Sequence, residues 1–153
     1  MGSEAVRLSV ELVPASCWCE NVRSVVTARE WDRLRKAVYA RADNKCEICG
    51  EQGRRHPVEC HEIWSYDDTT KVQRLERLIA LCPSCHEVKH LGLAEVRGRA
   101  RQAMLHLQRV NGWTEQQTIE YVAAQFDLWA ARSKHAWKTE LEKLNDHGVV
   151  WPR

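Results

Sequence analysis

The chain has 153 residues, which suits one domain or one domain with a helical appendage. Its 23 Lys and Arg residues nearly balance 21 Asp and Glu residues, and the formal net charge of +2 does not by itself indicate a nucleic-acid binder. No apolar run reaches the length of a membrane span, and the N-terminal stretch MGSEAVRLSVELVPAS lacks the apolar core of a secretory signal. We therefore expect a cytoplasmic protein with reduced thiols and no membrane partner.

The N-terminal segment, residues 1–43, is predicted to contain strands and a helix. Residues 7–13 (RLSVELV) alternate between polar and apolar side chains, which predicts a strand that ends before a proline. Residues 22–26 are expected to form a second short strand. A helix is predicted over residues 27–42 from a capping-box spacing and an apolar stripe at helical intervals (Thr27 and Glu30; Trp31, Leu34, Val38 and Ala42).

The central segment, residues 44–92, is predicted to form a β-hairpin followed by a helix. One arm covers residues 57–64, a polar turn covers residues 65–70, and the other arm includes residues 78–81. The chain then enters a helix that begins near His86.

The C-terminal segment, residues 93–153, is predicted to be helical. One helix spans residues 93–110 and ends at Asn111-Gly112. Thr114 and Gln117 have capping-box spacing for a last helix that runs towards Leu144. Tryptophans, which outnumber phenylalanine seven to one, are expected to supply much of the core (Trp31, Trp64, Trp113, Trp129 and Trp137).

Two C-x-x-C pairs stand out among the seven cysteines: Cys46 with Cys49, and Cys82 with Cys85. Two such turns, each of which directs two sulfurs at one centre, predict one structural zinc site with four thiolate ligands. A redox C-x-x-C pair and buried free thiols are the alternatives. Cys17 and Cys19 form a C-x-C pair that could join a metal site, but we favour ordinary buried thiols for both.

The segment 44–92 resembles the HNH endonuclease family. The resemblance rests on ECHE at residues 59–62 and on CPSCHEVKH at residues 82–90, which follows the apolar stretch LIAL. It implies an α+β fold, in which a ββα-metal core held by the four-cysteine zinc is wrapped by an N-terminal strand-and-helix segment and two C-terminal helices.

The resemblance also assigns roles to individual residues. His61 falls on the general-base position, and His86 falls on the closing histidine of the motif, at the start of the metal-binding helix. His90 lies four residues later on the same helical face. Cys60, His86 and His90 would then bind a second divalent metal, which could be Zn²⁺, Ni²⁺, Mn²⁺ or Mg²⁺.

The chain departs from the family pattern at two positions. Arg77 falls where the family has an asparagine, and it is expected to clamp the scissile phosphate instead of orienting His61. Cys60 stands in place of Asp or His, and a thiolate favours zinc over magnesium. Glu59 and Glu62 are candidates for a carboxylate that supports His61. The remaining histidines are expected to be surface or packing residues (His56, His106, His135 and His147).

DNA is the expected partner, although helices with alternating charges are often only solvated faces. The residues expected to contact phosphates are Arg54, Arg55, Lys89, Arg97 and Arg101. The predicted function is a metal-dependent endonuclease that hydrolyses phosphodiester bonds in DNA. The alternative is a catalytically degenerate zinc module that binds nucleic acid or a protein partner without cleavage.

Overall fold

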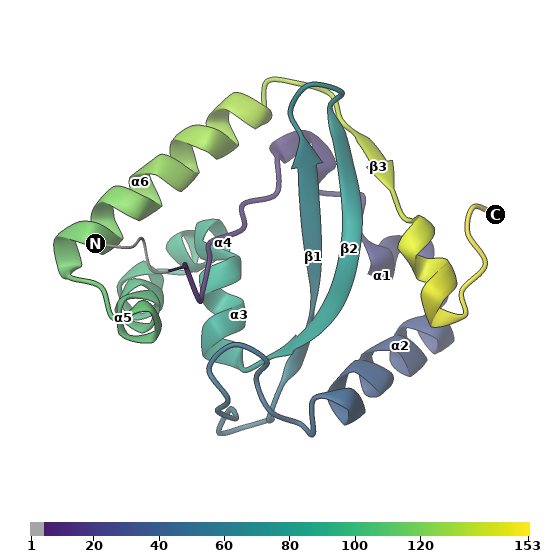
Figure 1. Ribbon diagram of the computed structural model, residues 1–153, viewed down its shortest axis with the longest axis horizontal. Helices are drawn as coiled ribbons and strands as arrows, with labels where there is room; N and C mark the ends of the chain where they lie inside the picture. Colours follow the sequence, from purple (N-terminus) through teal and green to yellow (C-terminus); the bar gives the residue numbers. More distant parts are fainter. Residues whose placement is uncertain (1–4) are drawn as a thin grey trace.

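A small sheet stands at the centre of the computed structural model, which describes residues 5–153 (Figure 1). Strands β1 (Glu59–Asp67) and β2 (Val72–Leu81) form an antiparallel hairpin, and β3 (Lys138–Glu140) pairs in parallel with β2. The strand order β1-β2-β3 leaves β1 at an edge of the sheet. The predicted α+β class and hairpin are confirmed, but β2 begins at Val72 and is therefore longer than the predicted arm.

A β-bulge in β2 changes which side chains face each side of the hairpin. Ile63 lies opposite Arg77, whereas Trp64 lies opposite Leu75, so Glu76 is the additional residue. An extra residue shifts the alternation of side chains by one position. Leu75 and Leu78 therefore point to the same side of the sheet and pack in the same hydrophobic cluster.

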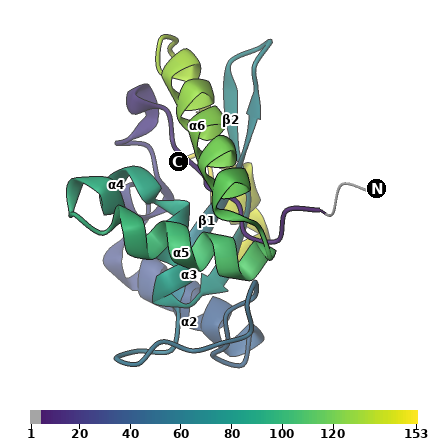
Figure 2. The same ribbon diagram turned by 90° about the vertical axis from the view of Figure 1, so that its left-hand side faces the viewer.

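Helices cover both sides of the hairpin (Figures 1 and 2). Helices α3 (Pro83–Lys89) and α5 (Ala100–Asn111) pack on one side, around a cluster that includes Ile79, Leu81, Val88, Leu91 and Leu107. Helix α2 (Ala28–Arg41) and the 3-10 helix η2 (Glu142–His147) pack on the other side, around a cluster that includes Val22, Leu34, Val38, Leu78 and Leu144.

The predicted helix starts with capping boxes are confirmed. The side chains of Thr27 and Thr114 accept hydrogen bonds from the backbone N–H three residues later, at the starts of α2 and α6 (Glu115–Arg132). Gly112 ends α5 with a left-handed φ of 65°, a conformation that glycine adopts without a steric cost.

Residues 7–13 do not form the predicted strand. Their backbone groups bond to the helices instead of to another strand: the Val10 N–H donates to the Tyr121 hydroxyl, and the Glu11 N–H donates to the Lys89 carbonyl. The alternating pattern arises because Leu8 and Val10 enter the core beside α3 and α5. This extended segment brings Glu11 to the interior of the molecule.

Three further predicted elements are wrong. Residues 22–26 contain helix α1 (Val22–Val25), because Asn21 and Ser24 form a capping box at its start. The helix predicted over residues 93–110 is divided into α4 (Leu91–Val96) and α5 by a turn at Gly98, whose φ is 71°. The last helix ends at Arg132, after which the chain supplies β3 and η2.

The core is mainly aliphatic, which corrects the expectation of a tryptophan core. Trp137 is buried, whereas Trp31, Trp64 and Trp113 lie at the margins of the two clusters. The indole N–H groups explain these positions, since a buried N–H needs an acceptor. The Trp129 indole, for example, donates to the Val13 carbonyl.

The three predicted segments share these clusters. One cluster combines Val10 from the N-terminal segment, Val88 from the central segment and Val122 from the C-terminal segment. Residues 1–4 of the predicted N-terminal segment lie outside the described residues. Within residues 5–153, no helix is both long and apolar enough to cross a membrane.

Candidate metal centres

The two C-x-x-C pairs converge at the base of the hairpin. Cys46 and Cys49 lie in the loop after α2, where Gly50 has a φ of 78° and donates its N–H to the Cys46 carbonyl. Cys82 is the N-cap of α3, and Cys85 lies in its first turn. The four sulfur atoms lie within 4.8 Å of one another, as the spacing predicts. This group is a candidate structural metal site.

The protonation of the thiols indicates that the cluster suits a cation. Hydrogen bonds from Cys82 and Cys85 to the Cys46 thiolate lower the pKa of Cys46. The same bond raises the pKa of Cys82 to about 12. The thiols of Cys82 and Cys85 therefore stabilise the Cys46 thiolate, and a metal that binds all four sulfurs would displace their protons.

A histidine from α5 contacts the cysteine cluster. His106 is buried, and its Nε2 lies 3.2 Å from Cys85 Sγ. Its other ring nitrogen, Nδ1, lies 3.1 Å from an Arg109 guanidinium nitrogen. Burial and the neighbouring guanidinium lower the pKa of His106, so the ring is neutral near pH 7. His106 is therefore a packing residue, as expected, and it also contacts a sulfur of the cluster.

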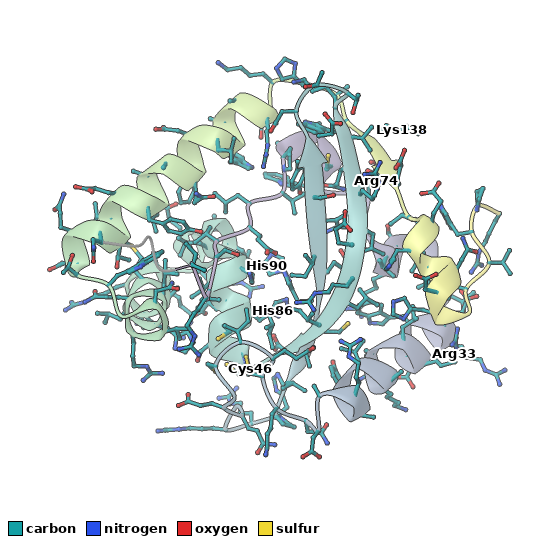
Figure 3. The ribbon with its side chains drawn as sticks, in the orientation of Figure 1. Arg33, Cys46, Arg74, His86, His90 and Lys138 are labelled. Atoms are coloured by element: carbon teal, nitrogen blue, oxygen red, sulfur yellow. The ribbon has the colours of Figure 1, made fainter. Side chains whose placement is uncertain are left out.

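Three histidines form a second cluster between β1 and α3. His61 comes from β1, His86 lies on α3, and His90 is the C-cap of α3 one turn later, on the same side of the helix as His86 (Figure 3). One nitrogen of each ring lies within 4.8 Å of those of the other two. The Nε2 atoms of His86 and His90 are 3.1 Å apart. Converging imidazole nitrogens are the ligands that divalent transition metals prefer.

Carboxylates lie within hydrogen-bonding distance of two of these rings. Glu59 Oε2 lies 2.5 Å from His86 Nδ1, and Glu11 Oε2 lies 2.7 Å from His61 Nε2. A carboxylate accepts these bonds, so His86 keeps its Nε2 lone pair and His61 keeps its Nδ1 lone pair. Carboxylates behind metal-binding histidines fix the ring orientation in this way.

The charges of the two carboxylates are stabilised differently. The hydrogen bond from His86 lowers the pKa of Glu59 to about 2. Burial alone raises the pKa of Glu11, but the bond from His61 and the Lys89 ammonium outweigh burial and lower it. Glu11 lies in the segment that was predicted to be a strand, and it had no predicted role.

Cys60 does not belong to the histidine cluster. Adjacent residues of a strand point to opposite sides, and because His61 faces α3, Cys60 packs in the cluster on the α2 side. Burial raises the pKa of Cys60 to about 12, so its thiol stays protonated near pH 7. The structure thus brings His86 and His90 together with His61 in place of Cys60.

The predicted phosphate-binding residues have different environments. Lys89 is only 2% exposed, and its ammonium donates to Ser9 Oγ at 2.8 Å and to Glu11 Oε1 at 2.9 Å, so it is not available to a phosphate. Arg77 is exposed on β2 and does not line the cleft beside the histidines. The remaining predicted residues are exposed: Arg54, Arg55, Arg97 and Arg101.

Cys17, Cys19 and Glu62 belong to neither the cysteine cluster nor the histidine cluster. Cys17 is buried as expected, but Cys19 is exposed, because the loop before α1 turns it towards solvent. Glu62 accepts the Val22 N–H at the start of α1 and does not support His61.

The segment His86-Glu87-x-x-His90 also has the spacing of a zinc metalloprotease motif. Its glutamate is instead held by Arg99 at 2.6 and 3.2 Å.

A cleft of about 870 Å³ borders the histidine cluster along β1. The three histidines line it, together with aromatic side chains from the loop before α1, α2, β1 and α6 (Trp18, Trp31, Trp64, Tyr66, Phe126 and Trp129). Its charged lining is mainly acidic, with Arg23 beside Glu11, Glu20, Glu62 and Glu95. A bound metal would therefore be reached from this cleft.

Comparisons with family models, curated proteins and solved structures found no match to this chain.

The buried Lys89–Glu11 pair gives a first prediction. We expect Lys89→Met to lower the free energy of unfolding by about 2 kcal/mol, because it leaves a half-buried carboxylate with one partner fewer. Arg97→Met, at an exposed position, should leave this free energy unchanged within about 0.5 kcal/mol. Urea denaturation of both variants measures the difference. Equal stability of the two variants would contradict the buried pair.

The histidine cluster gives a pH-dependent prediction. Burial lowers the pKa of His90 to about 4, below its unfolded value of about 6.5. The unfolded chain therefore binds the proton first, and stability falls as the pH decreases below about 6.5. We expect a loss of about 1 kcal/mol between pH 7 and pH 5.5 from this group. His90→Gln should reduce the pH slope by that amount, as measured by urea denaturation without added metal. An unchanged slope would refute the assignment.

Proposed function

We propose that the protein is a metal-dependent endonuclease of the HNH type that hydrolyses phosphodiester bonds in DNA. The observation that carries this proposal is the convergence of His61, His86 and His90 from a hairpin and the helix that directly follows it. This arrangement agrees with the ββα-metal core that the sequence resemblance implies. One cysteine pair precedes β1, and the other lies where β2 leads into α3.

The four cysteines are proposed to hold a structural zinc. Four sulfurs from two C-x-x-C turns match the tetrahedral thiolate coordination that zinc adopts in structural sites. The cluster joins the loop after α2 to the start of α3. Bound zinc would therefore fix the helix that carries His86 and His90 relative to β1.

The three histidines are proposed to hold the second divalent ion. When bound, such an ion polarises a phosphate oxygen and lowers the pKa of a bound water. The chain contributes the neutral rings, because burial lowers the pKa values of His61 and His90. Glu11 and Glu59 contribute the orientation of the rings. His61 is thus proposed as a ligand, in place of the general-base role that the resemblance implies.

The lining of the cleft favours a second candidate, a zinc module that binds a partner without cleavage. The charged side chains beside the histidines are mainly glutamates, and Arg77 lies outside the cleft. A polyanion gains little from such a lining unless metal ions are bound. The exposed arginines Arg54, Arg55, Arg97 and Arg101 are the remaining candidates for phosphate contacts.

Plasmid cleavage distinguishes the two functions. Supercoiled plasmid is incubated with the protein and Mg²⁺, Mn²⁺, Ni²⁺ or Zn²⁺, and nicked and linear products are measured against the same reaction with a chelator. The nuclease proposal expects cleavage with at least one of these metals. Binding of DNA without cleavage under all four metals would support the binding module, and the absence of both would reject DNA as the partner.

A further inference from the structure

The cysteine cluster has a contact from outside the hairpin–helix unit. His106 belongs to α5, yet its ring reaches Cys85, which is fully buried. Helix α5 also packs against α3 through Ala103 and Leu107 in the shared core, and Arg99 at its N-cap pairs with Glu87 of α3. His106 Nε2 and Cys85 Sγ are 3.2 Å apart, within the distance of an N–H···S hydrogen bond.

Arg109 fixes the direction of this hydrogen bond. A guanidinium has only N–H donors, so His106 Nδ1, 3.1 Å from the Arg109 nitrogen, must accept. The ring proton then lies on Nε2 and is donated to Cys85 Sγ. The sulfur is therefore the acceptor, as a metal-bound thiolate would be. Arg109 is largely exposed and lies one turn after His106 on α5, so a local contact selects the tautomer.

We propose that His106, oriented by Arg109, is a positioning residue that stabilises the metal-bound Cys85 thiolate and couples the docking of α5 to metal occupancy. The proposal rests on the zinc assignment made above for the four cysteines. A site of four thiolates around one divalent ion carries excess negative charge, and a donated N–H reduces the charge on one sulfur. Because the same hydrogen bond joins α5 to a sulfur of the cluster, it links the position of α5 to the metal site.

Zinc transfer to a chromogenic chelator tests the proposal on the zinc-loaded full chain. His106→Phe keeps a ring of similar size without the donor, and we expect zinc release to become about 10-fold faster or more. His106→Gln retains a side-chain N–H and should restore part of the slow release. Arg109→Met, which frees the tautomer, should fall between wild type and His106→Phe. His135→Phe, at an exposed histidine, is the matched control and should release zinc at the wild-type rate.

A wild-type chain with bound zinc whose release rate is unchanged by His106→Phe would overturn the positioning role and leave the zinc site intact. A wild-type chain without zinc would overturn the site itself, so metal analysis separates the two failures. Nitrogen-15 NMR of the wild-type ring covers the case in which His106→Phe does not fold. The Nε2–H tautomer is expected in the zinc-loaded protein, and a Nδ1–H tautomer or a doubly protonated ring would refute the proposal.

Discussion

Replacement of Cys82 by Ser is expected to remove the zinc that we propose for the four cysteines, and with it the folded core. Cys82 is buried at the junction of β2 and α3, where its sulfur belongs to the four-cysteine cluster. Apparent zinc-binding free energies of such sites are about 10–16 kcal/mol, whereas a domain is stable by only about 5–15 kcal/mol. Metal analysis and the near-UV circular dichroism of the packed tryptophans should both show the loss.

Cys82→Ser distinguishes the role of Cys82 as a metal ligand from its role as a helix cap. The Cys82 side chain accepts the Cys85 N–H as the N-cap of α3, and Ser is a preferred N-cap residue. Loss of the fold in Cys82→Ser would therefore come from the missing ligand. Cys19→Ser is the control, because Cys19 is an exposed cysteine outside the cluster, and it should keep one zinc and a cooperative thermal transition. A folded, zinc-free Cys82→Ser protein would show that the metal is not structural.

Local sequence signals predicted the elements that depend on neighbouring residues. The capping boxes at Thr27 and Thr114 and the left-handed Gly112 are interactions within one turn, so spacing alone identifies them. The cysteine cluster was also predictable, because each C-x-x-C turn fixes two of its sulfurs. The hairpin followed from two apolar arms around a polar turn.

The missed features depend on contacts between distant segments. Residues 7–13 have the alternation of a strand, but that pattern cannot show that a hydroxyl of α6 and a carbonyl of α3 satisfy their backbone. Glu11 reaches His61 across 50 positions of the sequence. The buried Lys89 was predicted to be a surface cation for a related reason, since helical spacing does not show which face an incoming segment will cover.

The choice between Cys60 and His61 shows the same limit at the site. Both residues fall on positions of the motif that carry functional side chains, and the side-chain alternation of a strand requires that only one faces α3. Packing decides the choice: Cys60 lies among the residues on the α2 side, and His61 lies over His86 and His90 with ring centroids 5.2 Å apart in each case. The motif assigns roles to the two residues only by analogy with the family. The register of the hairpin shows which of the two side chains points towards α3.

The substitution His61→Ala is expected to remove the second metal that we propose, and the proposed cleavage activity should be lost with it. Three imidazoles form the cluster, and removal of one leaves two ligands for an ion that needs three or more. We expect His61→Ala and His90→Ala to weaken binding of the second metal by more than about 100-fold, and Glu59→Gln to weaken it by about 10–100-fold through His86. Cobalt substitution reports the two sites separately, because thiolate ligands give intense charge-transfer bands and imidazoles do not.

The control is Cys60→Ser, which should keep the second metal and the cleavage rate, because its side chain lies on the other side of the strand. Two other outcomes would contradict the assignment of His61 as the ligand. If His61→Ala retains the second metal and loses cleavage by about 10²–10⁴-fold, His61 is a general base, as the resemblance implies. If Cys60→Ser loses the metal, the ion must bind on the side of β1 that carries Cys60 and not on the side that carries His61. The metal content of these two variants therefore determines which residue of β1 is the ligand, whatever the cleavage assay shows.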